Sequence, residues 1–168
     1  MGDHIIDTNV LLVASARDPN SPFADCNQAT PQQQQIVLDW LMAFRTDRQR
    51  QVVIDQPFKI WEEYHNKMTG QDIGLMVVME KLQFARFVDI AFDDNGHACL
   101  PADLEEVVHD RSDRKFVAAA LSAGGQSTIV NAVDTDWCDW QKALERHGIV
   151  VTHLIEGLRR GLPSRRKR

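Results

Sequence analysis

The chain has 168 residues, of which 43% are hydrophobic and 26% are charged, the ordinary proportions of one globular domain that is long enough to bury a core. No stretch approaches the roughly 20 apolar residues of a membrane span, and the first residues lack the pattern of a secretion signal. Three cysteines without paired spacing make a disulfide framework improbable, so we expect a reduced, cytoplasmic protein.

Charge is spread unevenly along the chain. The net charge is −5, but the last ten residues hold six Arg or Lys and no acid; without those six, 13 basic side chains face 24 acidic ones, a net charge of −11. We therefore expect one domain over residues 1–155 and a basic tail over 156–168. The acidic body should repel nucleic acid unless cations intervene, whereas the tail either attracts phosphates or is simply a solvated terminus.

Short apolar runs alternate with helical patterns. In chain order we expect a strand at 4–6, helices from 10 and over 31–44, a strand at 52–54, helices over 57–68 and 73–86, a strand at 87–90, a helix over 113–123, a strand at 128–130, a helix over 136–147 and a strand at 149–151. This alternation predicts a parallel sheet covered on both faces, a three-layer α/β/α sandwich of the Rossmann-like class. Sites in such sheets form beyond the carboxyl ends of the strands.

Acidic residues follow several of these strands. Asp7 comes directly after the first strand, Glu62 and Glu63 lie in the helix after the second, Asp113 begins an apolar helix, and Asp134 and Asp136 follow the strand that ends near Val130. Carboxylates that share a cleft raise one another's pKa unless cations balance them. Hard oxygen ligands select Mg²⁺ or Mn²⁺, so the pattern indicates a site for one of these ions.

Each acid also has a simpler interpretation. Asp7 could close a turn after the strand, Asp113 could be only a helix cap, and Glu62 and Glu63 could face solvent. The segment Asp134–Asp136 could be merely a loop and a cap. His97 and Cys99 stand near a turn-forming Asp93–Gly96 sequence, for which a plain turn is the better interpretation than a metal site.

Four segments resemble, in order, the motifs of the PIN-domain family. They are Ile5–Leu12 (IIDTNVLL), Trp61–Tyr64 (WEEY), Asp113–Ala120 (DRKFVAAA) and Ile129–Trp137 (IVNAVDTDW). The resemblance extends from Ile5 to about Val151. In the fourth motif Asn131-Ala132 stands where many members have Thr or Ser, and Asp134 lies further from the strand, which leaves the division of work between Asp134 and Asp136 open.

The resemblance implies a PIN-like, metal-dependent endoribonuclease that hydrolyses RNA phosphodiesters with a water activated by Mg²⁺ or Mn²⁺. Asp7, Glu63 (preferred to Glu62), Asp113 and Asp134 would hold one or two ions, with Asp136 as an outer ligand. Thr8, Asn9 and Asn131 would hydrogen-bond the carboxylates or metal-bound water, and Arg111, Arg114 and Lys115 would meet substrate phosphates.

The biological context is less determined by the residues. Compact PIN domains are often toxins held by an antitoxin protein, which is the leading context by resemblance. The apolar faces of the helices at 36–44 and 73–86, the second with Leu75, Met76, Val78 and Met79, could support a homodimer or simply pack in the core.

Two other functions share part of this pattern. A haloacid-dehalogenase-like phosphatase also places an Asp after its first strand but needs a second Asp where this chain has Asn9. A non-catalytic PIN-fold module that binds RNA or a protein partner is the remaining alternative.

Overall fold

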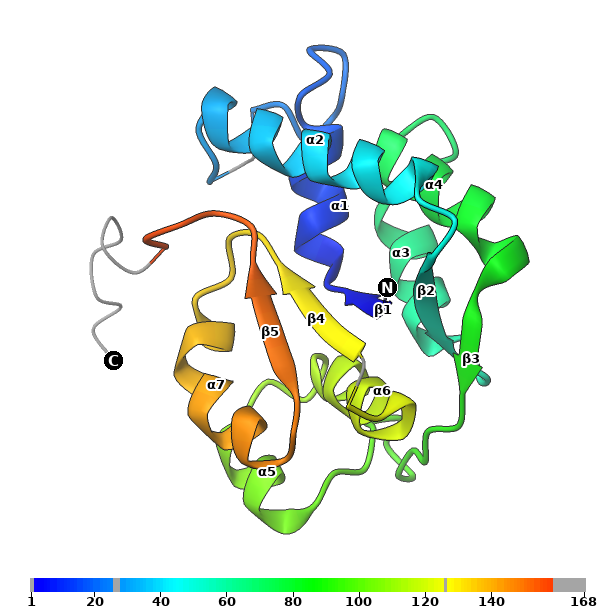
Figure 1. The fold of residues 1–168 in the computed structure, drawn as a ribbon, viewed down its shortest axis with the longest axis vertical. Helices are drawn as coiled ribbons and strands as arrows, with labels where there is room; N and C mark the ends of the chain where they lie inside the picture. Colours follow the sequence, from blue (N-terminus) through cyan, green and yellow to red (C-terminus); the bar gives the residue numbers. More distant parts are fainter. Residues whose placement is uncertain (1, 26–27, 126, 159–168) are drawn as a thin grey trace.

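The computed structural model describes residues 2–25, 28–125 and 127–158. Within them, five parallel strands form one sheet in the order β3-β2-β1-β4-β5 (Figure 1). The strands are β1 (Gly2–Ile6), β2 (Arg50–Asp55), β3 (Arg86–Val88), β4 (Ser127–Asn131) and β5 (Val150–His153). Each described strand pair is parallel, as the alternation of strands and helices in the sequence predicts.

The central strand β1 is where the order of the sheet reverses. His4 of β1 pairs with Val52 on one side and with Thr128 on the other. From β1 the chain first adds β2 and β3 on one flank, and then returns to add β4 and β5 on the opposite flank. The carboxyl ends of β1 and β4 therefore border the crevice in which parallel α/β sheets bind their ligands.

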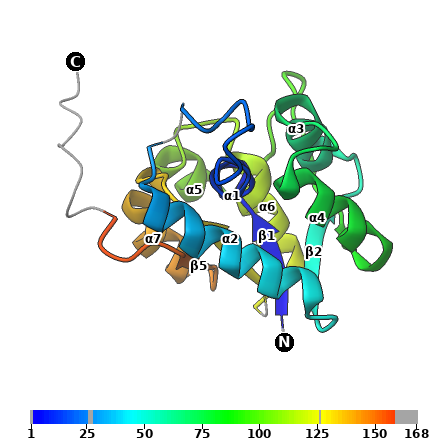
Figure 2. The ribbon, with the colours of Figure 1, turned by 90° about the horizontal axis from the view of Figure 1, so that it is seen from above.

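Helices cover both faces of the sheet. They are α1 (Thr8–Ser15), α2 (Pro31–Thr46), α3 (Lys59–Lys67), α4 (Ile73–Lys81), α5 (Ala102–Val107), α6 (Arg114–Ala123) and α7 (Asp136–Arg146). Helices α1, α2 and α4 pack together, α6 lies across four strands, and α5 packs on α7. Figure 1 shows the α1, α2 and α4 group above the sheet and α5, α6 and α7 below it, and Figure 2 looks down on the first group. This arrangement confirms the three-layer α/β/α sandwich.

Local sequence explains how these helices begin and approach. Thr30 and Gln33 form a capping box ahead of Pro31, which starts α2. Helix α4 meets α1 at Gly74, where a Cβ atom would stand 2.6 Å from the Leu11 carbonyl oxygen. Only glycine therefore permits this close contact between α4 and α1.

Most element boundaries differ by one or two residues from the sequence-based expectation, and three differences have a clear physical cause. Helix α1 begins at Thr8, because the Asp7 carboxylate caps it by accepting the Asn9 N–H. Helix α4 ends at Lys81, five residues before the expected end, and the Lys81 Nζ donates to the carbonyls of Asp47 and Arg50. A 3₁₀ turn (Leu82–Phe84) then leads into β3, which begins one residue before the expected strand. Helix α5, which was not expected, has only six residues and is too short to show a helical period.

The apolar surface of α4 divides between the core and the solvent. Leu75 and Val78 are buried, whereas Met76 and Met79 are exposed. Among the described residues, no helix combines the length and apolar character that a membrane crossing requires. Of the basic tail expected over 156–168, only residues 156–158 are described, and residues 159–168 lie outside the described residues.

Candidate functional site

Asp7 lies at the switch point of the sheet and is held by three elements. Its backbone N–H donates to the Val130 carbonyl at 3.0 Å, which joins the end of β1 to β4. Its Oδ1 accepts the Asn9 N–H at 3.0 Å, and its Oδ2 accepts Nε1–H of the buried Trp137 at 2.5 Å. The side chain is nearly buried, with 5% of the residue exposed. The carboxylate is therefore both a helix cap and a fixed group at the crevice.

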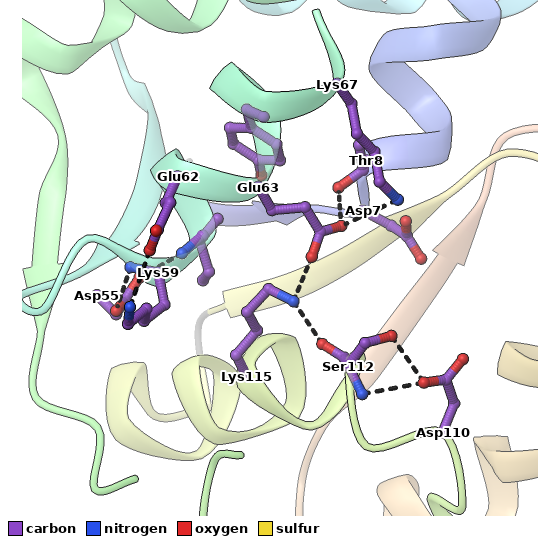
Figure 3. Close-up of polar contacts among 12 residues, drawn as sticks. Asp7, Thr8, Asp55, Lys59, Glu62, Glu63, Lys67, Asp110, Ser112 and Lys115 are labelled. Atoms are coloured by element: carbon purple, nitrogen blue, oxygen red, sulfur yellow. Dashed lines mark hydrogen bonds and ion pairs between the residues drawn. The ribbon is translucent and has the colours of Figure 1, made fainter. Parts of the chain in front are cut away.

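Glu63 reaches the same place from α3. Its Oε1 accepts a hydrogen bond from Thr8 Oγ1 at 2.5 Å, and its Oε2 forms an ion pair with Lys115 of α6 (Figure 3). The adjacent Tyr64 is buried and donates its hydroxyl to the carbonyl of Ile6, the last residue of β1. Helix α3 is thus anchored one residue before Asp7, with Glu63 directed to the crevice.

Glu62 has a different environment from its neighbour. Its carboxylate pairs with Lys59 at 2.9 Å, and its side chain is 55% exposed, against 19% for Glu63. The helix therefore turns Glu63 toward the first-strand acid and Glu62 toward solvent, which is the orientation preferred from the sequence.

Asp113 precedes α6, but its carboxylate makes no hydrogen bond that caps the helix in the described structure. Nearby, Lys115 Nζ donates to the Ser112 carbonyl at 2.5 Å while it pairs with Glu63, and Asp110 accepts the N–H and hydroxyl of Ser112 (Figure 3). The Asp113 side chain therefore does not cap α6, and its carboxylate is not tied to the helix backbone.

Asparagine side chains shape the loop that carries Asp134. Asn9 Oδ1 accepts the N–H groups of Ala132 and Val133 at 2.9 and 3.1 Å, and Asn9 Nδ2 donates to Asn131 Oδ1 at 3.0 Å. Asn131, fully buried, also accepts the Asp134 N–H and donates to its carbonyl. These bonds draw the loop after β4 against the start of α1, so the longer spacing to Asp134 is taken up by a folded turn.

The charges of these acids act on one another. Burial raises the pKa of Asp7 to about 6; hydrogen bonds from Asn9 and Trp137 oppose this, and the negative charges of Asp134 and Glu63 add to it. Burial also raises the pKa of Asp113 to about 8, with further increases from Asp7, Asp110 and Asp134. Asp7 is therefore within electrostatic range of Glu63, Asp113 and Asp134, which together we call the carboxylate cluster. Lys115 and the more distant Lys67 both pair with Glu63, so two cations face four acids.

Asp136 begins α7 and donates its backbone N–H to Asp134 Oδ1 at 2.9 Å. Asp134, by contrast, raises the pKa of both Asp7 and Asp113. The sequence does not distinguish the roles of these two acids. In the structure the charge of Asp134 acts on Asp7 and Asp113, whereas the Asp136 N–H helps to hold the loop that carries Asp134.

The donor set fits a hard divalent cation by chemistry and by charge. All four acids offer carboxylate oxygens, the ligands that Mg²⁺ and Mn²⁺ prefer, and their mutual repulsion is what such an ion would relieve. Within the part of the chain that the structure describes, no three His, Cys, Asp or Glu side chains already stand in a metal-holding arrangement. The fit therefore rests on the kind of donor and the excess charge, and not on preformed coordination.

The three basic residues expected to meet phosphates are placed differently. Arg111 is exposed and lines a cavity, and Lys115 lines the same cavity while it pairs with Glu63. Arg114 points elsewhere: its guanidinium donates to the carbonyls of Val108 and Glu105, at 3.0 and 2.9 Å, and fastens α5 to the start of α6.

Sequence reasoning gave no role to Trp137 or Tyr64, although each follows an acid of the site motifs. A buried aromatic with a polar tip next to an acidic residue is a signal that could have suggested their anchoring hydrogen bonds. The turn at Asp93 is as expected: its Oδ1 accepts the N–H groups of Asn95 and His97, and Gly96 has a positive φ of 79°. That this turn places His97 in a cavity with Lys59 has no signature in the sequence.

Comparisons of the chain with protein-family models, with curated proteins and with solved structures found no match.

Proposed function

We propose that this chain is a metal-dependent endoribonuclease of the PIN type, with Asp7, Glu63, Asp113 and Asp134 as the residues that would hold Mg²⁺ or Mn²⁺. The observation that carries the proposal is that these acids lie within electrostatic range of one another at the switch point of a parallel sheet. Burial, with the charges of neighbouring acids added to it, raises the pKa of Asp7 to about 6 and of Asp113 to about 8. A divalent ion bound there would supply a Lewis acid for phosphodiester hydrolysis.

The remaining residues of the site position these carboxylates. Trp137 and the Asn9 N–H hold the two oxygens of Asp7, and Thr8 holds Glu63. Such partners fix the direction of a ligand's lone pairs, so their loss weakens metal binding without removing a ligand. Lys115 balances part of the charge and stands where it could contact a substrate phosphate beside the carboxylates.

Neighbouring acids in the same helix provide a matched test. Glu63→Gln removes a carboxylate that faces the cluster, whereas Glu62→Gln removes one that faces solvent. Cleavage of a labelled single-stranded RNA should require Mn²⁺ or Mg²⁺ and should fall about a hundredfold or more in Glu63→Gln, because transition-state charge loses its stabilisation. Glu62→Gln should cleave as the unchanged protein does.

Asp134 and Asp136 form a second pair for the same assay. Asp134→Asn should abolish most cleavage, and Asp136→Asn should reduce it only modestly, since Asp136 reaches the site through its backbone bond to Asp134. Circular dichroism checks that each variant is folded. Equal cleavage by folded Glu63→Gln and Glu62→Gln would refute the assignment of the site.

One observation favours a second candidate, a non-catalytic module that binds RNA or a protein. The Lys115–Glu63 ion pair supplies part of the positive charge that a catalytic ion would bring. In a binding module this pair would be permanent, and RNA binding would proceed without divalent ions and without cleavage. The divalent-ion dependence of product formation therefore separates the two candidates.

A further inference from the structure

A cavity of about 200 Å³ opens next to the carboxylate cluster. It lies between the start of α3, the turn that contains His97 and the segment that leads into α6. Its charged lining consists of Lys59, Arg111 and Lys115, and among the described residues that line it none is acidic. Figure 3 shows Lys59 and Lys115 arriving from two different helices, α3 and α6. Three cationic side chains therefore line one cavity, although Lys59 and Lys115 also pair with Glu62 and Glu63 outside the lining.

Lys115 joins the cavity to the carboxylate cluster. An ammonium group carries three N–H donors. Glu63 and the Ser112 carbonyl accept two of them, and the residue is nearly buried, with 9% exposed. The ammonium is therefore held in place by its existing partners, and an anion in the cavity could accept the third donor. An anion bound there would lie one side chain away from the proposed metal ligands.

His97 adds a polar group that lacks a partner. Its Nδ1 is buried without a hydrogen bond in the described structure, and Asp93 Oδ1 is 4.0 Å away. Asp93 Oδ1 already accepts the N–H groups of Asn95 and His97. A buried nitrogen without a partner is costly, and a ligand atom in the cavity would relieve that cost.

The two exposed cations complete the lining. Lys59 has an exposed side chain that pairs with Glu62, so its ammonium can rotate toward a ligand at little cost. Arg111 brings a planar group with five N–H donors, which suits the paired oxygens of a phosphate. The volume holds a phosphate group together with several water molecules, each of which occupies about 30 Å³ in the liquid.

We propose that this cavity binds one phosphate group of the RNA strand, so that an adjacent phosphodiester lies at the carboxylates. The identity of the ligand as RNA rests on the proposed function, whereas the anion site rests on the cavity alone. The phosphate is either the terminal monophosphate at a 5′ end or an internal phosphodiester. A terminal monophosphate carries nearly twice the charge, so a preference for it distinguishes the two sources.

The first experiment titrates the full chain with inorganic phosphate in EDTA and follows backbone amide signals by NMR. Signals of Gly96, His97 and Ser112 should shift and saturate. Arg111→Gln should weaken this binding about tenfold, the effect of one charge-assisted hydrogen bond. Arg48→Gln, which removes an exposed cation before the amino end of β2, should not. Shifts confined to other parts of the chain, or equal binding by Arg111→Gln, would overturn the proposal.

The second experiment measures RNA binding by fluorescence anisotropy, again in EDTA so that no metal-dependent cleavage can occur. Arg111→Gln and Lys59→Gln should each lower the salt dependence of binding, by about 0.7 in the slope of log K against log salt, and Arg48→Gln should leave it unchanged. Tighter binding of a 5′-phosphorylated oligonucleotide than of its 5′-hydroxyl form identifies a terminal-phosphate site, and equal binding identifies an internal one. Either result supports phosphate binding in the cavity only if Arg111→Gln binds the oligonucleotides more weakly than the unchanged protein does.

The outcome is independent of the nuclease assay. If phosphate binds in the cavity but neither the unchanged protein nor any variant cleaves RNA, the anion site is supported and the nuclease proposal is refuted. Cleavage that depends on Glu63 but not on Arg111, His97 or Lys59 would remove the phosphate site and leave the nuclease.

Discussion

Replacing Asp113 with Asn should stabilise the metal-free protein at alkaline pH. The pKa of Asp113 is raised from 3.8 in the unfolded reference to about 8 in the fold. Between these values the folded protein binds a proton that the unfolded chain has lost, so the free energy of unfolding decreases as pH rises through this range. Below about pH 4 both states are protonated and the residue has no pH-linked effect. Asparagine keeps the shape and removes the ionisation.

The magnitude follows from the size of the shift. One pKa unit corresponds to about 1.4 kcal/mol, and the shift spans about four units. Asp113 is partly exposed, so solvent screening reduces the full value, and we expect Asp113→Asn to gain about 3 kcal/mol at pH 9 and almost nothing at pH 4. No capping hydrogen bond is lost in the described structure, because the Asp113 side chain makes none to the helix.

Urea unfolding in EDTA, followed by tryptophan fluorescence from pH 4 to pH 9, measures this difference. Asp39→Asn is a matched control, because Asp39 is an exposed acid on α2 that accepts a hydrogen bond from Gln35. The reasoning fails if Asp113→Asn is no more stable than the unchanged protein at pH 9, or if Asp39→Asn gains as much. Adding Mn²⁺ should stabilise the unchanged protein most at high pH, where the cluster is ionised, by about 2.7 kcal/mol at a hundred times the dissociation constant.

Two further changes test the packing and the hydrogen bonding around the site. Gly74→Ala should destabilise the fold by about 1–3 kcal/mol, because its Cβ would press on the Leu11 backbone, whereas Gly70→Ala, with open space around it, should be nearly neutral in thermal denaturation. Trp137→Phe should remove the hydrogen bond to Asp7 Oδ2 and so raise the pKa of that carboxyl further; the Asp7 carboxyl titration, read by NMR, would contradict this if it did not move upward.

Much of the candidate site could be predicted because the acidic motifs come directly after strands of a parallel sheet. Asp7 and Asp134 both follow strands, so a parallel sheet places them at the same carboxyl end. The aromatic Tyr64 directly after Glu63 indicates that Glu63, and not Glu62, lies on the inward side of the helix. The sequence does not tell that Asn9 and Asn131 would fold the Asp134 loop against α1, because such bonds join residues 122 positions apart.

Other parts of the structure have no local sequence signal. In the sequence Lys115 is one of three basic residues near Asp113. Only tertiary packing decides that Lys115 pairs with Glu63 and that Arg114 binds carbonyls at and just after the end of α5. The cavity lined by Lys59, Arg111 and Lys115 forms where the turn near His97 meets the start of α3, two segments whose sequence patterns are unrelated. Short elements such as α5 leave no period for sequence reasoning to detect.

The most direct test is the position of a bound ion. A crystal of the protein soaked in Mn²⁺ should show an anomalous scattering peak among the carboxylates of Asp7, Glu63, Asp113 and Asp134, and the peak should vanish in Asp7→Asn crystals of the same form. A fully occupied Mn²⁺ elsewhere, with these four carboxylates bound to no ion, would contradict the proposal that they form a metal-dependent nuclease site.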